Sequence, residues 1–425
     1  MNKRVLYIIF LTALSPLYSH AETLQEAWLD VVKVDYTLKA MKENTRASEH
    51  QLGAAKAARL PSLSLDAAYT VMENDPTAIA NFQGLAFQLP MAEQESLQYR
   101  ATTTVPIYTS GQISQGIEAA TALLEAANYT EKGTELRLKL SVAEAFVAVF
   151  RATKSLDVAI SHVDSLMAHE RDVENMYGQG MVFRNDLLAA QVALADAKQH
   201  AIKVENIFDM SQSAYNRLLG RPLNQPVQLE KIVIETMDEP LSALTQRALQ
   251  QRHELNILSK QIDALKHQSK AIYAESGPQL GLTAGYTFQE NQYQLYEDQW
   301  GINLGMKWTI FDAGLVKNKA RSIERQAAAL THLYHDVSGK IKLQVRQYWL
   351  AQEETRKRIQ VTEKSVGQSK ENLRVNRDRY ENGLSTNTEV LDAEALRVQS
   401  EGNHANAIYD AVLVSLRLKW ATSDL

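Results

Sequence analysis

Two carboxylates near the end of the chain are the first residues whose type and spacing could do chemistry. Glu389 and Asp392 lie three residues apart after the stretch Y-E-N-G-L-S-T-N-T, so a helix would present both on one face. Repetition in a symmetric oligomer would stack two rings of negative charge, and like charges at close range favour a bound cation or a proton. The alternative is a solvated charged turn at a helix start, where acidic residues are favoured in any case.

The histidines offer less chemistry. His332 and His335 are three apart in T-H-L-Y-H and could supply half of a metal site, but no nearby cysteine or carboxylate pair completes it. His169 begins H-E-R-D-V, which lacks the second histidine of a zinc protease motif, and we interpret it as part of a charged helix face. The chain has no G-x-S-x-G turn, phosphate-binding glycine loop or dinucleotide fingerprint. We expect no enzyme, no cofactor and no metal, and a periplasmic hydrolase would need a nucleophile site that is missing.

Composition and the N-terminus bound the class of protein. The 425 residues are 45% hydrophobic, and 45 Lys and Arg stand against 50 Asp and Glu, so a nucleic-acid partner is not expected. Residues 1–21 combine Lys3 and Arg4, an apolar run and a small-residue cleavage site, which predicts a secretory signal peptide. The chain has no cysteine. An exported protein without disulfides is therefore expected.

The chain repeats itself. The segment from Pro61 matches the one from Pro278 at a displacement of 217, whereas the glycine turns at Gly111 and Gly180 match Gly314 and Gly383 at a displacement of 203. A constant displacement indicates helices of fixed length, and the change of 14 predicts a longer loop between Val71 and Thr104. We expect a first repeat over 22–223, a mixed connector over 224–239 and a second repeat over 240–425.

Long helices must position the glycine turns. No proline occurs between Ile107 and Arg221 or between Gln279 and Leu425, and proline is the residue that breaks helix interiors. About 65 residues of helix would then span roughly 100 Å. Apolar residues recur at spacings of three and four, which predicts a coiled-coil seam: Leu136, Leu140, Val142, Phe146 and Phe150, then Leu330, Leu333, Val337, Ile341, Val345 and Trp349.

Four alternating runs predict strands near 62–71, 99–108, 279–288 and 300–310. Each run has one apolar and one polar face and about 10 residues, the length of a tilted strand that crosses a bilayer. Aromatic residues suited to the membrane interface stand near the ends of these runs: Tyr69, Tyr286, Trp300 and Trp308. A soluble β-sandwich would give the same alternation. Four strands cannot bury their own edges in lipid, however, so a membrane sheet would have to share a barrel with copies of itself.

These motifs, in this order and spacing, resemble the TolC-type outer-membrane efflux proteins over residues 22–425. The resemblance rests on the repeat, on P-x-L-x-L at Pro61 and Pro278, on I-F-D-A-G-L at Ile310, and on the Y-x-x-G turns at Tyr177 and Tyr380. It implies a mainly α protein with a membrane β-barrel. Three chains would give a 12-stranded barrel, four strands from each, that continues into an α-helical coiled-coil tunnel in the periplasm.

The same resemblance implies roles for single residues. Glu389 and Asp392 fall where acidic residues ring the narrow periplasmic entrance, and Tyr380 and Asp186 fall where a latch closes it. The family's second latch uses an arginine and a threonine, and Ser385 and Asn185 respectively stand in those places here, which puts that latch in doubt. The turns around Gly180, Gly383 and Leu384 would dock a periplasmic adaptor.

The function implied is a duct of a tripartite efflux or type I secretion system. Its partners would be two further copies of the chain, a periplasmic adaptor, an inner-membrane RND or ABC transporter, and outer-membrane lipid. The alternative is a structural or adhesive coiled-coil protein of the cell envelope. The sequence identifies neither the substrate nor the pump.

Overall fold

The computed structural model describes residues 21–233 and 237–425, which form two compact units. The predicted signal peptide, residues 1–21, lies outside the described residues apart from Ala21, and the predicted connector lacks residues 234–236. The first unit holds the described chain up to Tyr36, Glu135–Thr245 and Gln344–Leu425; the second holds Thr37–Thr134 and Gln246–Leu343. Within the described part of the chain, no helix is long and apolar enough to cross a bilayer.

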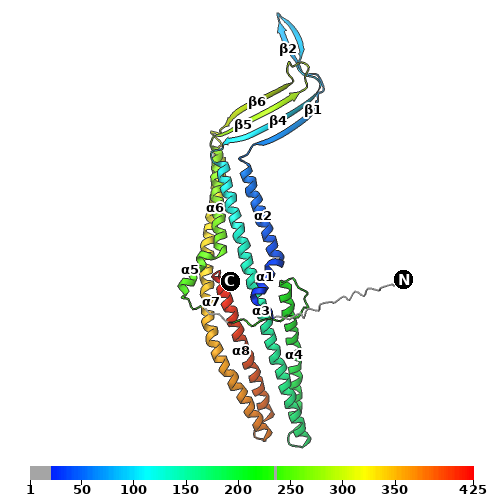
Figure 1. Ribbon diagram of the computed structural model, residues 1–425, viewed down its shortest axis with the longest axis vertical. Helices are drawn as coiled ribbons and strands as arrows, with labels where there is room; N and C mark the ends of the chain where they lie inside the picture. The colour runs from blue at the N-terminus through cyan, green and yellow to red at the C-terminus, as the bar shows by residue number, and fades with distance from the viewer. Residues whose placement is uncertain (1–20, 234–236) are drawn as a thin grey trace, which may run out of the picture. The chain divides into compact units, whose positions relative to one another are not determined.

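The first unit is helical. It contains α1 (Leu24–Val34), α4 (Arg184–Leu218), α8 (Asn387–Ala421), the later parts of α3 (Gln112–Gly178) and α7 (Leu315–Glu381), and the start of α5 (Leu241–Gln251) (Figure 1). Its apolar core joins α1, α3 and α4, because Val31, Phe146 and Tyr215 are fully buried against one another. The connector completes this core: Glu22 bridges to Leu229, and Ile232 packs on the same cluster.

The two halves of the chain fold into matching helices. Helices α3 and α7 have 67 residues each, and α4 and α8 have 35 residues each. Left-handed residues also recur in register, at Gly111 and Gly314 and at Gly180 and Gly383. The predicted mainly helical fold with a two-fold internal repeat is therefore confirmed.

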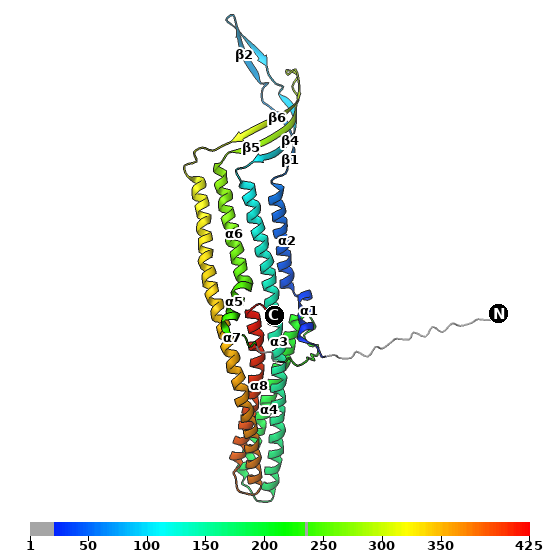
Figure 2. The same ribbon diagram turned by 60° about the vertical axis from the view of Figure 1, so that its left-hand side comes forward.

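The second unit places four helices beside one sheet. Helices α2 (Tyr36–Ala57) and α6 (His253–Tyr273) lie beside the first parts of α3 and α7 (Figure 2). Polar contacts fix the pairs: the Thr45 hydroxyl donates to Glu131 at 2.8 Å, and the Ser269 hydroxyl donates to the Ala320 carbonyl at 3.1 Å. A short 3₁₀ helix, Ala274–Ser276, follows α6 and leads into the sheet.

The sheet has four antiparallel strands in the order β1-β4-β5-β6. Their bounds are Ser62–Val71, Glu95–Tyr108, Gln279–Gln289 and Asp298–Lys307. The prediction that the last strand continues to residue 310 is wrong. Gln279 pairs with Lys307, and Pro278 before it leaves no backbone partner for Trp308. The Trp308 indole instead donates to the Ser276 carbonyl at 3.0 Å, and the chain turns at Ala313 and Gly314.

A second small sheet lies where the sequence predicted only a longer loop. Strands β2 (Thr77–Phe82) and β3 (Leu85–Pro90) form a hairpin joined by Gln83 and Gly84, both with positive φ, at 51° and 86°. Two such residues are typical of the type I′ turn that closes two-residue hairpins. The extra residues of the first repeat therefore build a defined element.

Candidate functional site: the two helix turns and the amphipathic sheet

The turns at the ends of α3 and α7 share one backbone design. In the first, the Gly180 amide donates to the Tyr177 carbonyl and the Met181 amide to the Met176 carbonyl, each at 2.9 Å. In the second, Gly383 and Leu384 make the equivalent bonds at 2.9 and 2.7 Å. This is the Schellman arrangement, which needs a left-handed residue where each glycine stands. The glycines of the Y-x-x-G motifs are therefore explained by backbone geometry.

The second turn also fixes the predicted acidic residue Glu389. Its carboxylate accepts the Thr386 amide at 3.0 Å and the Ser385 hydroxyl, and the Glu389 amide donates to the Thr386 hydroxyl at 3.3 Å. This capping box begins α8. The hydrogen bond from Ser385, followed by that from Thr386, lowers the pKa of the Glu389 carboxyl. Glu389 is exposed, as is Asp392 one turn later, and their alignment in a ring remains a prediction.

Tyr380 belongs to an apolar cluster where four helices meet near the turns. It is 6% exposed and packs with Val173 of α3, Ala190 of α4 and Val390 of α8. Its hydroxyl has no hydrogen-bond partner among the described residues. Burial, and then the charge of Asp186, raises the pKa of that hydroxyl. The two residues of the predicted latch are thus neighbours without a bond, and the latch remains a prediction.

A different hydrogen-bond chain links the two turns. The buried His169 ring contacts the Asn387 side-chain oxygen through Nε2 at 2.7 Å, and the side-chain nitrogen of Asn387 donates to the Asp186 carbonyl at 3.0 Å. The interpretation of His169 as part of a charged surface is wrong, because His169 is 5% exposed while Arg171 and Asp172 face outward. Helical spacing alone did not distinguish the two faces here. Burial lowers the pKa of His169 and so favours the neutral form of the ring in the folded protein.

A buried ion-pair network lies two turns farther along α8. Glu394 is 1% exposed and accepts from Arg397 at 2.6 and 3.1 Å and from His162 of α3 at 2.9 Å. Burial alone would raise the pKa of the Glu394 carboxyl, but the hydrogen bonds from His162, Arg397 and Ser165 outweigh it and lower that pKa to about 2. Arg397 also binds Glu401 at 2.8 Å. The network fixes α3 to α8. The sequence predicted that these residues lie on helices but did not predict their ion pairs.

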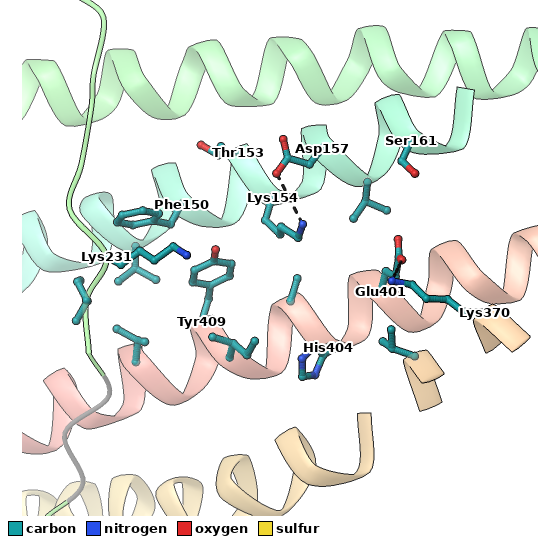
Figure 3. Close-up of a pocket in the computed structure, with 17 residues that line it drawn as sticks. Phe150, Thr153, Lys154, Asp157, Ser161, Lys231, Lys370, Glu401, His404 and Tyr409 are labelled. Atoms are coloured by element: carbon teal, nitrogen blue, oxygen red, sulfur yellow. Dashed lines mark ion pairs between the residues drawn. The ribbon is translucent and has the colours of Figure 1, made fainter. Parts of the chain in front are cut away.

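A groove of about 730 Å³ lies between α3, α7, α8 and the connector (Figure 3). The Phe150 and Tyr409 rings lie parallel in it, with centroids 6.4 Å apart. Lys154 pairs with Asp157 at 3.7 Å, and Lys370 pairs with Glu401 at 3.0 Å. His404 contacts the Thr362 hydroxyl at 3.1 Å. The groove therefore holds paired charges between apolar walls.

Metal-binding geometry is also absent from residues 21–233 and 237–425, where no group of three or more His, Asp or Glu side chains converges. His332 and His335 are both exposed on α7. They are therefore surface histidines.

The four-stranded sheet is amphipathic across its full width. The strand register places the apolar residues of all four strands on one face: Leu63, Leu65, Ala67 and Tyr69; Leu97, Tyr99, Ala101 and Val105; Leu280, Leu282, Ala284, Tyr286 and Phe288; Trp300, Ile302, Leu304 and Met306. The other face carries Ser, Thr, Asn, Gln and Gly, with charges only at Asp66, Arg100 and Lys307 among the described strand residues. Asp66 lies directly opposite Arg100. One face therefore suits lipid and the other suits water.

The predicted interface aromatics lie at both ends of this sheet. Tyr69, Tyr286 and Trp300 stand at the end away from the helices, where Tyr286 pairs with Trp300 across the strands. The Tyr69 and Tyr286 hydroxyls donate to Glu95 at 2.5 Å and to Asp298 at 3.3 Å. Trp308 stands at the other end, just after β6. Their contact with a membrane interface remains a prediction.

Comparison with known proteins finds the same architecture. Residues 33–221 and 244–422 match the profile of the family described as "Outer membrane efflux protein". The chain is 22% identical to the outer membrane protein TolC of Vibrio cholerae over all of this chain and 96% of that protein. It is 24% identical to the alkaline protease secretion protein AprF of Pseudomonas aeruginosa over 71% of this chain and 64% of that one.

A solved structure shows the same fold. The outer membrane protein VceC from Vibrio cholerae superposes with a TM-score of 0.81 at 17% identity, covering 94% of this chain and 95% of that one. The family match spans both repeats and agrees with the helix turns and the sheet described above. This chain belongs to the outer membrane efflux protein family.

Proposed function

We propose that this outer-membrane efflux duct works as a homotrimer whose three sheets close into one 12-stranded barrel, continued by a helical tunnel in the periplasm. The observation that carries the proposal is the apolar face of the sheet. In the single chain Leu65, Ile302 and Leu304 are 75%, 67% and 66% exposed. Strands β1 and β6 each have one unpaired edge in the described sheet. Lipid would cover the face, and copies of the chain would pair the edges.

The partners follow from the same proposal. The chain shows no site for energy-yielding chemistry among its described residues, so a transporter in the inner membrane would drive transport, joined through a periplasmic adaptor at the turns around Gly180, Gly383 and Leu384. The match to the family described as "Outer membrane efflux protein" supports an efflux pump, and similarity to AprF, a secretion protein by name, supports a secretion system. Glu389 and Asp392 would ring the entrance, and Tyr380 and Asp186 would stabilise its closed form.

Conductance in planar bilayers tests the duct and its entrance together. We expect the purified parent protein to conduct ions, and we expect the double variant Glu389→Ala, Asp392→Ala to lose selectivity for cations, because six carboxylates leave the entrance of the trimer. Glu363→Ala, which removes an exposed carboxylate from the other helix, α7, is the matched control and should leave selectivity unchanged.

Three results would count against the proposal. Absence of current from both the parent and the double variant would overturn the duct. Unchanged selectivity in a conducting double variant would remove only the acidic ring. Extraction of the folded protein from cells without detergent would favour the alternative, a structural or adhesive coiled-coil protein.

A further inference from the structure

The hairpin β2–β3 carries an exposed apolar surface that the duct does not explain. Cross-strand pairs place Ala78, Ala80, Phe82, Leu85, Phe87 and Leu89 on one side, which we call the hairpin face. Phe82 and Leu85, which flank the turn, are 68% and 65% exposed. The opposite side carries Thr77, Asn81 and Gln88 together with Ile79, Ala86 and Pro90. An exposed patch of this kind marks an interaction site.

Hydrogen bonds fix the hairpin at the point where it joins the end of the four-stranded sheet. The Met91 amide donates to the Pro76 carbonyl at 2.7 Å, and the Met72 amide donates to the Gln94 carbonyl at 2.8 Å. The side chain of Asn291, which is 1% exposed, donates to the Met91 carbonyl at 3.0 Å from the loop between β5 and β6. Figures 1 and 2 both show β2 projecting beyond the end of the sheet opposite the helices. A two-stranded hairpin is marginally stable alone, so this surface needs a partner.

Charge restricts what the partner can be. The 16 residues from Pro76 to Met91 contain no Asp, Glu, Lys or Arg, so the hairpin has no ionic group with which to recognise a charged protein or nucleic acid. The segments that flank the hairpin are acidic, with Glu73 and Asp75 before it and Glu93 and Glu95 after it. These four flanking carboxylates oppose insertion into a phosphate-rich lipid surface, because like charges repel.

The position of the hairpin in the chain favours a second copy of the same protein. The hairpin follows β1, which pairs only with β4 and forms one edge of the described sheet. In the proposed trimer that edge adjoins the next copy, so three hairpins stand around one threefold axis. The uncharged hairpin faces can pack on one another around this axis, while the acidic flanking segments stay apart.

We propose that the hairpin faces of three copies pack together over the outer mouth of the duct and narrow it. This inference rests on the proposed trimer. The contact buries Phe82, Leu85 and Phe87 against their counterparts and leaves Asn81 and Gln88 in water. The hairpin is then an apolar constriction of the outer mouth of the duct.

Cysteine chemistry tests the contact without background, because the chain has no cysteine of its own. The variant Phe87→Cys places a thiol on the hairpin face, and Gln88→Cys places one on the opposite side of the same strand as the matched control. Mild oxidation of the purified trimer should convert a large part of Phe87→Cys into disulfide-linked dimers, with the third copy left as monomer, and should leave Gln88→Cys mostly monomeric. Replacement of Thr77–Pro90 by a short Gly-Ser linker should raise the single-channel conductance.

Further measurements separate the possible failures. Native mass spectrometry of each variant reports the trimer, and its absence overturns the proposed function together with this inference. A trimer in which Phe87→Cys and Gln88→Cys cross-link equally little overturns only the packing of the hairpin faces. A nitroxide attached at Phe87→Cys that collides with lipid-soluble oxygen and shows no spin–spin coupling assigns the hairpin to lipid and also overturns it. A linker variant with unchanged conductance overturns the constriction.

Discussion

At the scale of single residues, His169 is the side chain that we expect to make the stability of the helix turns sensitive to acid. Groups that face it are Asp172 on α3, Arg377 and Tyr380 on α7, and Asn387 and Glu394 on α8. Burial lowers the pKa of His169, and Arg377 lowers it further, while the hydrogen bond with Asn387 partly opposes them. Because the pKa of His169 is lower in the folded state, its neutral ring makes its full contribution to the free energy of unfolding at a pH above the unfolded pKa of about 6.5. That contribution is lost as the pH falls below this value.

The pH dependence of thermal unfolding checks this assignment. We expect the midpoint temperature of the parent to fall between about pH 7 and about pH 5.5, in the range where the unfolded imidazole gains its proton. His169→Gln keeps a donor for Asn387 and cannot titrate, so its midpoint should fall less over that range. His332→Gln removes an exposed histidine of α7 and should behave like the parent. Equal acid sensitivity in all three proteins would contradict a buried neutral ring.

The sequence predicted residue types at the turns better than their bonds. Glu389 was expected in an acidic ring or, alternatively, as a charged residue at a helix start, and its carboxylate takes part in helix capping, since Thr386 and Ser385 donate to the same oxygen. The T-x-x-E pattern of the capping box was a usable signal. His169 gave no usable signal, because its burial depends on which helices pack around α3. Local spacing does not contain that information.

At the scale of elements, glycine conformation sets where α7 ends. Gly383 has φ 68°, and a Cβ added there would meet nothing within 4 Å. Gly383→Ala should therefore destabilise the turn by about 1 kcal/mol through left-handed strain alone. Gly367 lies inside α7 with equally open surroundings and without positive φ. Gly367→Ala should stabilise the helix by about 0.5–1 kcal/mol.

The two alanine variants make a matched pair with opposite signs. Midpoint temperatures of thermal unfolding, measured under the same conditions, should fall for Gly383→Ala and rise for Gly367→Ala. A rise in both would show that the left-handed turn is not retained in the assembled protein.

Sequence patterns predicted the long helices α3 and α7 but not the short hairpin β2–β3. The constant displacement of 203 residues predicted fixed helix lengths because glycine turns and the absence of proline define helix ends, and α3 and α7 have equal lengths. The hairpin β2–β3 was missed because Gln83–Gly84 is a weak turn signal. The end of β6 depended on where its partner β5 begins, which is a tertiary constraint.

At the scale of the whole molecule, the polar face of the sheet acquires a role only in an assembly. Asp66, Arg100, Thr287 and Gln299 lie opposite one another in a row across the four strands. In the proposed barrel this row would be repeated three times around the lumen. Three carboxylates would alternate with three guanidinium groups, and their charges would cancel. This row by itself would therefore favour neither cations nor anions.

Removal of the Asp66 charge and removal of the Arg100 charge should therefore change ion selectivity in opposite directions. Asp66→Asn leaves three arginines in the lumen wall and should shift the reversal potential in a salt gradient toward anions, because fixed charges in a pore select counter-ions. Arg100→Gln should shift it toward cations, and the double variant should return to the parent value. Both shifts should shrink at high salt, since the screening length falls to about 3 Å at 1 M. If current persists and neither single variant moves the reversal potential, the face with Asp66 and Arg100 does not line the conducting path.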